Sequence, residues 1–322
     1  RDGRCCIIKS CHSIQQVKRE RKRSRKKIKK NYKKVCKLKI IYLPLYHKNK
    51  ITMYQIDQLK ELAPAAFRTP EQGAERGVSK QYQFMTTAEI IDGLSGMGWN
   101  AHSATQQKSK KNPETTKHMI RFRHDDFGSL GVKGNIPEIL FVNSHDRTCS
   151  LNFHVGIFRL ICSNGLVVAD TTFDKFRVRH MGTKFSEVKH MITDITKKLP
   201  TVFSAIDRFE HVILKDNAQE EFAMRAFAIR FPEYIDVKTN QVDYAKVQKN
   251  VNVNDILKAV RPEDNGADLW RVYNRVQEHL IGGGFQHIGQ TNKAKATRPI
   301  TNIRMNMLVN KGLWTLAEEF AN

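Results

Sequence analysis

The sequence lacks the long hydrophobic runs that membrane proteins need. No segment approaches the roughly 18–20 consecutive apolar residues of a membrane-spanning helix. The apolar stretch LKIIYLPLYH, at residues 38–47, is shorter and is interrupted by Pro44. It therefore also fails as the apolar region of a secretory signal. We expect neither a membrane span nor a membrane partner.

Cysteine is scarce beyond residue 52, where only Cys149 and Cys162 occur. Two cysteines offer no disulfide framework, and such scarcity is typical of the reducing cytoplasm. The histidines form neither H-x-x-H nor H-E-x-x-H, the spacings of common zinc sites. The segment GGGFQHIGQ, at residues 282–290, lacks the G-K-[ST] of a phosphate-binding loop. The sequence therefore predicts a cytoplasmic protein without a metal or a cofactor.

Positive charge is abundant and unevenly placed. The formal net charge is +23, of which +17 falls in residues 1–52 and +6 in residues 53–322. Hydrophobic residues make up 40% of the chain and charged residues 27%, the composition of a globular protein. The chain is long enough to bury a sizeable core. The body of the protein is therefore only mildly basic, and the leader carries most of the charge.

Residues 1–52 have three competing interpretations. The run RERKRSRKKIKKNYKK, at residues 19–34, suits a disordered arm that binds phosphates. Three cysteines and a histidine between residues 5 and 12 offer zinc ligands, but without the paired spacing of a zinc module. The abrupt change of composition at Met53, the first methionine, favours translated sequence upstream of the true start. We adopt this last interpretation and expect residues 53–322 to form a single domain.

The body changes its hydrophobic period halfway along. Residues 53–182 contain a helix ended by Pro64, a short strand at 81–85, a helix opened by a capping box at Thr86, and then segments with the period of two that strands show. The predicted strands of the sheet cover residues 100–110, 116–124, 138–146, 149–161, 166–170 and 174–180. Residues 183–322 have helical spacing throughout. The predicted helices cover residues 185–214, with a kink near Pro200, and residues 217–231, 254–260, 267–284 and 302–320. This order predicts an α+β fold with an antiparallel β-sheet core followed by a C-terminal helical bundle.

His145 and Asp146 are the candidate catalytic residues. They adjoin at the end of a predicted strand, where such a pair can supply a general base or two metal ligands. No other carboxylate or histidine lies at a telling spacing, although His154 or Asp170 could converge on them across a hairpin. A polar turn with a hydrogen-bonded histidine explains the same residues, and both interpretations stay open.

Basic residues concentrate in the predicted sheet, where residues 101–200 contain 16 Lys and Arg against 9 Asp and Glu. Cationic side chains beside aromatic rings are how single strands are held, because charges follow the phosphates and rings stack on bases. The predicted phosphate contacts are Lys117, Arg121, Arg123, Arg159, Arg177 and Arg179. The plainer alternative is that these side chains only form the solvated face of the sheet.

Several segments together resemble one known family. They are APAAF, QYQFMTTAEIIDGLSGMGW, TKHMIRFRH, VNSHD, GIFRLICSNGL, LWRVYNRVQEHLIGGG and IRMNMLVNKGLW. In kind and order they are similar to the phage- and plasmid-borne family called domain of unknown function nine hundred and thirty-two, from about Met53 to the C-terminus. The resemblance implies a mobile-element protein in a bacterial cytoplasm. It assigns no catalytic residues, because the family has no established activity.

We therefore expect a nucleic-acid-binding accessory protein of a phage or plasmid, a binding protein and not an enzyme. Its expected partner is single-stranded DNA during recombination, replication or protection of the element. A metal-dependent nuclease that uses His145 and Asp146 is the first alternative. The second is an inhibitor of a host defence protein, which would make a host protein its partner.

Overall fold

The computed structural model describes residues 53–68, 86–111, 113–128, 134–146, 149–159, 165–167, 177–178, 185–289 and 293–322. The chain divides into two compact units, Arg1–Lys50 and Ile51–Asn322, and all of the described residues belong to the second. The interpretations of the basic leader therefore concern residues outside the described part, as does the strand predicted at residues 81–85.

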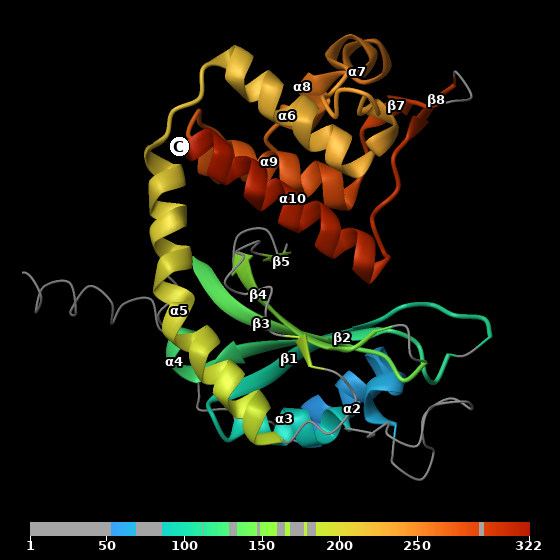
Figure 1. Ribbon diagram of the computed structural model, residues 1–322, viewed down its shortest axis with the longest axis vertical. Helices are drawn as coiled ribbons and strands as arrows, with labels where there is room; N and C mark the ends of the chain where they lie inside the picture. Colours follow the sequence, from blue (N-terminus) through green and yellow to red (C-terminus); the bar gives the residue numbers. More distant parts are fainter. Residues whose placement is uncertain are drawn as a thin grey trace, which may run out of the picture. The chain divides into compact units, whose positions relative to one another are not determined.

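An antiparallel sheet of six strands lies in the first half of this unit (Figure 1). Its strands are β1 (Trp99–Gln106), β2 (His118–His124), β3 (Asn135–Asn143), β4 (Leu151–Arg159), β5 (Gly165–Val167) and β6 (Arg177–Val178). Strands β1 to β5 lie in the order of the sequence, and β6 also pairs with β4. Consecutive strands pair with each other because short connections bring neighbours in the chain together.

The side chains of β2 alternate between the two faces of the sheet. Ile120 and Phe122 are fully buried in the main hydrophobic core. Met119 belongs to a second, smaller apolar cluster. Arg121 and Arg123 share the face of Met119, as the alternation in the sequence predicted. We call this side the polar face of the sheet.

Short helices cover the opposite face of the sheet, against the main core. They are α2 (Met53–Leu62), the 3-10 helix η1 (Pro64–Phe67) and α3 (Thr87–Ser95), and a short α4 (Asp125–Gly128) follows β2. The capping box predicted at Thr86 is present: its hydroxyl accepts from the Glu89 N–H and the Glu89 carboxylate accepts from the Thr86 N–H, both at 3.1 Å. The N–H groups of Thr86 and Glu89, at the start of α3, thereby gain hydrogen-bond partners.

One long helix, α5 (Phe185–His211), contributes to both halves of the unit (Figure 1). Near its middle, Thr196 Oγ1 accepts a hydrogen bond of 3.2 Å from Trp99 Nε1 of β1. Near its end, the Phe209 ring packs against the Trp314 ring, with 5.3 Å between centroids. The sheet and the C-terminal helices therefore share a single core.

The second half of the unit is mainly helical. It contains α6 (Asp216–Arg230), η2 (Pro232–Tyr234), α7 (Tyr244–Asn250), α8 (Val253–Leu257), η3 (Pro262–Asp264), α9 (Leu269–Gly282) and α10 (Ile303–Ala321), with a hairpin of β7 (Gln286–Ile288) and β8 (Ala294–Ala296). Helix α10 packs against α6 and α9. Gly312 permits the approach to α6, because a Cβ there would lie 2.7 Å from Ile229 Cγ2.

The predicted α+β fold class is confirmed, with a sheet followed by C-terminal helices. Helix α7 and the β7–β8 hairpin were not predicted, because they are too short to show a clear period. The helix predicted at residues 185–214 is present as α5, with Pro200 inside it, and the kink near Pro200 stays a prediction. In the described part of the chain, no helix is long and apolar enough to cross a membrane.

Candidate functional site

Two of the predicted phosphate contacts are held by one buried carboxylate. Glu138 of β3 accepts from Arg121 Nη1 at 2.6 Å and from Arg123 Nε at 2.9 Å, and its own side chain is fully buried. The Arg123 guanidinium also lies 3.8 Å from the centroid of the Phe158 ring. The two arginine side chains are only 15% and 12% exposed. Glu138 therefore neutralises one of the two positive charges, and both guanidinium groups are held inside the folded protein.

The same cluster lies near a histidine whose pKa is lowered. His102 of β1 is exposed and interacts with the charges of Arg121, Arg123 and Glu138; its pKa is lowered, first by partial desolvation and next by the charge of Arg123. Glu138 acts in the opposite direction but does not overcome these effects. The polar face of the sheet therefore disfavours a further positive charge at this point.

Arg159 connects the sheet with the helices instead of facing solvent. Its Nη1 donates to Asp264 Oδ1 at 2.8 Å, and both residues are almost fully buried. Arg177 lies in β6, opposite Asn152 of β4, and Arg179 lies outside the described residues. Of the six predicted contacts, Lys117 is thus the one with a described side chain and no carboxylate within ion-pair distance among the described residues. The three paired arginines do not form the exposed basic surface that we expected.

The two candidate catalytic residues occupy different environments. His145 is fully buried after β3, and its ring centroid lies 5.3 Å from that of His118. Burial lowers the pKa of His118 to about 4, against smaller opposing effects of the Thr116 carbonyl and Asp146. Asp146 is partly exposed and lines a cavity. The described residues contain no group of three or more His, Cys, Asp and Glu that could hold a metal ion.

Two adjoining cavities lie between the polar face of the sheet and the start of α10. Their volumes are about 550 and 350 Å³. Gln107, Lys108 and Asn302 line both of them. The other charged residues in their walls are Arg121, Lys117, Asp146 and Arg304. Together with Lys108, the walls thus contain five charged side chains, and all of them except Asp146 are cationic. We therefore call the two cavities together the basic cleft.

The lysines of the cleft come from the connection between β1 and β2. This connection carries Lys108, Lys110, Lys111 and Lys117, of which the first three are exposed. Its one acidic residue, Glu114, is directed to Arg68, with 3.3 Å between Oε2 and Nη1. No carboxylate of the described residues lies within ion-pair distance of the four lysines. Their charge is therefore available to a ligand.

Helix α10 begins at the opposite wall of the cleft. Asn302 caps it, since its Oδ1 accepts from the Met305 N–H at 3.0 Å. The first turn carries the exposed Arg304 and no acidic residue. The partial positive charge at the N-terminus of this 19-residue helix adds to that of the side chains. Both walls of the cleft therefore attract anions.

Only part of this site was predictable from the sequence. Lys117 and Arg121 of the cleft were among the predicted contacts, whereas Lys108 was not. Arg304 and Asn302 were missed, because they are distant in the sequence and meet the sheet only through the packing of α10. The sequence does contain one signal for an anion-binding helix start at this point. Asn302 is a typical capping residue, and the turn that follows carries Arg304 and no acidic residue.

The fold and the site together define an α+β protein with a basic cleft between its sheet and its last helix. The model of the family described as domain of unknown function (DUF932) matches residues 76–314, and the chain belongs to this family, which confirms the resemblance seen in the sequence. Two curated relatives are UPF0380 protein YafZ and UPF0380 protein YfjQ of Escherichia coli (strain K12). Each is 30% identical over 264 residues, which cover 81% of this chain and 89% of the relative. No solved structure matches the chain.

Proposed function

We propose that the protein binds single-stranded nucleic acid in the basic cleft, as an accessory protein of a phage or plasmid. The observation that carries this proposal is the cleft itself, where Lys108 and Lys117 face Arg304 without carboxylate partners among the described residues. The interface differs in part from the one expected from the sequence: Lys117 stays in it, and Arg121 lines it while bound to Glu138. Arg159 is not included, because Asp264 occupies its guanidinium.

The size and chemistry of the cleft favour a single strand. A sugar–phosphate chain fits cavities of about 550 and 350 Å³, whereas an intact duplex is too wide to enter them. Lysines attract phosphates without reading the bases, so binding at this point is expected to be independent of sequence. The Phe158 ring is covered by Arg123, so this ring of the sheet does not offer a stacking platform for bases.

Charge reversal in the cleft provides the test. Lys108→Glu, Lys117→Glu and Arg304→Glu are compared in the full chain with Lys197→Glu and Lys258→Glu, which reverse exposed lysines on α5 and after α8. Fluorescence anisotropy measures the affinity for a single-stranded oligonucleotide at several salt concentrations. Each lost phosphate contact lowers the slope of log affinity against log salt by about 0.7. We expect this loss, together with weaker binding, in the three cleft variants and not in the two controls.

The comparison between variants removes the contribution of the basic leader, which is present in every sample. Equal slopes in cleft and control variants would show that the cleft does not hold phosphates. Tighter binding to a duplex than to a single strand of the same length would contradict the single-strand assignment.

The two alternative functions have less support. Asp146 lines the cleft, but His145 is buried beside it, and a nuclease of the predicted kind needs both to reach a ligand. An inhibitor of a host protein needs a continuous apolar surface. Among the described residues, the most exposed large apolar side chains lie on separate segments instead: Leu62, Ile213, Val237 and Val260.

A further inference from the structure

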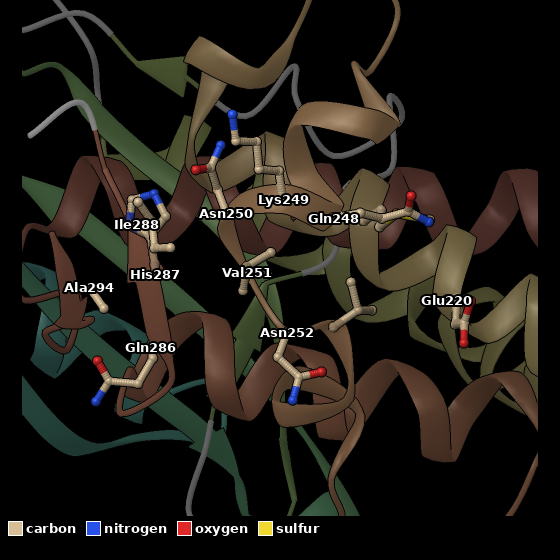
Figure 2. A pocket seen from close by; sticks show the side chains of 12 residues that line it. Glu220, Gln248, Lys249, Asn250, Val251, Asn252, Gln286, His287, Ile288 and Ala294 are labelled. Atoms are coloured by element: carbon tan, nitrogen blue, oxygen red, sulfur yellow. The ribbon is translucent and has the colours of Figure 1, made fainter. Parts of the chain in front are cut away.

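A further cavity, separate from the basic cleft, lies in the helical half and has a volume of about 460 Å³ (Figure 2). Its walls come from α6, from the end of α7 and the start of α8, and from the β7–β8 hairpin. Val251, between α7 and α8, forms an antiparallel bridge with His287 of β7. This bridge brings the connection between two helices against the hairpin. The cavity is therefore built in part by α7 and the β7–β8 hairpin, which were not predicted from the sequence.

The lining of this cavity is unusually rich in side-chain amides. Figure 2 shows four of them around the space: Gln248, Asn250, Asn252 and Gln286. We call the cavity the amide pocket. Asn250 is partly engaged, since its Nδ2 donates to the Lys246 carbonyl at 2.8 Å. Asn252 is engaged at both ends as the cap of α8: its Oδ1 accepts from the Asn254 N–H at 3.2 Å and its Nδ2 donates to Asp255 Oδ1 at 3.4 Å. Gln248 and Gln286 are exposed, with no hydrogen bond to another described side chain.

His287 adds a neutral imidazole to the wall of the pocket. The Tyr234 hydroxyl donates to the Ile288 carbonyl at 3.0 Å, so its oxygen must accept from His287 Nε2–H, 3.1 Å away. The pKa of His287 is lowered, mainly by burial and further by Arg230, against the opposite effect of Glu233. In this tautomer Nδ1 keeps a lone pair that can accept a hydrogen bond.

Apolar and charged groups complete the lining. Met224, Val251, Val253 and Ile288 give the pocket an apolar side, while Lys249 and Glu220 lie at its rim. Pockets for small ligands combine these features: a largely apolar wall and a few polar groups that fix orientation. Asparagine and glutamine can both donate and accept, and they pair with two adjacent atoms on the edge of a base.

We propose that the amide pocket binds a nucleobase. A planar ring with adjacent hydrogen-bond donors and acceptors suits the amides of Gln248 and Gln286 and the Oδ1 of Asn250, and its faces suit the apolar side chains. Lys249 is placed for a phosphate of the same nucleotide. This proposal deepens the proposed function and rests on it in one respect: the base is that of a single strand whose phosphates lie in the basic cleft.

The chain itself connects the two sites. Ala294 lines the amide pocket and Ile300 lines the basic cleft. The segment between β8 and α10 runs from the hairpin to the start of the helix (Figure 1). Ala294 and Ile300 are therefore no more than about 22 Å apart. The exposed Lys293, Lys295 and Arg298 lie along this stretch, and they give phosphates a route from one site to the other.

The test uses two kinds of variant in the full chain. Ala294→Trp fills the pocket, and Ala296→Trp on the same strand, outside the pocket lining, is its control. Gln286→Ala removes an exposed amide of the pocket, and Gln241→Ala removes an exposed amide elsewhere. Binding of homopolymeric adenine, thymine and cytosine oligodeoxynucleotides is measured by anisotropy. Binding of each free nucleoside monophosphate is measured by saturation-transfer NMR.

We expect the protein to prefer one base. Gln286→Ala should weaken binding of the preferred oligonucleotide about tenfold, the scale of one amide–base pair, and leave its salt slope unchanged. Ala294→Trp should abolish the preference, while both controls retain it. The cleft variants should show the reverse pattern, with a changed salt slope and an unchanged preference.

The outcomes separate the two proposals. Oligonucleotide binding without base preference, together with no binding of free nucleotides, would overturn the nucleobase pocket and leave the cleft intact. Binding of free nucleotides that Ala294→Trp abolishes, without binding of oligonucleotides, would support the pocket and overturn the cleft. Failure of both would overturn both.

Discussion

Single residues decide how much of the basic sheet can meet a ligand. Glu138 is a buried carboxylate that binds two arginines, and Asp264 is another that binds one. Removing one partner of such a buried group leaves an uncompensated charge, at a cost of about 3–5 kcal/mol. These pairs therefore fix the arginines in the fold before any ligand arrives. The exposed lysines of the cleft carry no such constraint.

The buried His118 predicts a dependence of stability on pH. Its ring is held between the Thr87 hydroxyl and the Thr116 carbonyl, each at 3.2 Å, and its pKa falls from 6.5 to about 4 on burial. In the unfolded chain the ring takes up a proton as the pH falls below 6.5, whereas the folded protein resists until about pH 4. Stability is therefore lost as the pH decreases through this window, by about 3 kcal/mol for this group.

Urea unfolding at pH 7 and at pH 4 checks this expectation. In His118→Gln the difference in unfolding free energy between the two pH values should be smaller than in the parent protein by about that amount. His190→Gln, at an exposed position on α5, is the control and should keep the full difference. The same difference in both variants would show that His118 is not held neutral by the fold.

At the scale of elements, α5 shows that packing can override a local signal. Pro200 lacks an N–H and would end or kink an isolated helix. In the protein the helix continues, and its buried stripe includes Leu199 and Val202 on either side of the proline. Burial along both halves of the unit thus favours one continuous helix over two shorter ones.

Replacing this proline should stabilise the protein. Pro200 is exposed, so Pro200→Ala removes the unfavourable helix propensity of proline, about 3 kcal/mol, without loss of core packing. The unfolded chain gains freedom at the same time, which offsets about 1 kcal/mol. A net gain of about 2 kcal/mol in urea unfolding is expected, while Thr201→Ala at the next position should change stability by less than about 1 kcal/mol. A loss of stability in Pro200→Ala would mean that the proline fits α5 without strain.

At the scale of the whole unit, the sheet and the C-terminal helices depend on each other. They share α5, a common hydrophobic core, and the buried pair of Arg159 and Asp264. Arg275 reinforces this junction by donating to the carbonyls of Asp264 and Gly266 at 3.1 and 3.0 Å. We expect residues 53–322 to unfold as one cooperative body despite the change of hydrophobic period halfway along.

Asp264→Ala tests this cooperativity. Hydrogen exchange followed by mass spectrometry should show β4 and α9 losing protection together, with a free energy of opening about 3–5 kcal/mol lower than in the parent. Glu263→Ala, at the exposed neighbouring position, is the matched control and should leave both segments protected. Loss of protection in α9 alone would identify the sheet as an independent folding unit.

The elements with a long, regular period were predictable, and those whose position depends on distant contacts were not. The alternation from Lys117 to Arg123 gave β2 and its two faces, and the capping box at Thr86 gave the start of α3. Helix α7 and the β7–β8 hairpin are too short for a period to rise above chance, and they are stabilised by contacts such as the bridge between Val251 and His287. The amide pocket could not be predicted from the sequence, because α7 and this hairpin form much of its wall.

The α+β order, the strand faces and the excess of positive charge are properties of local sequence, because period and composition act over a few residues. Which cations remain available to a ligand is decided by residues that meet only in the folded chain. Glu138 of β3 pairs with two arginines of the neighbouring strand β2, and Asp264 of the helical half pairs with Arg159 of the sheet. Arg304 lines the cleft because α10 packs beside the sheet. Local sequence thus determined the long, regular elements and the total charge. The tertiary structure alone decided where that charge is neutralised and where it is presented, since ion pairing depends on distance in space and not along the chain.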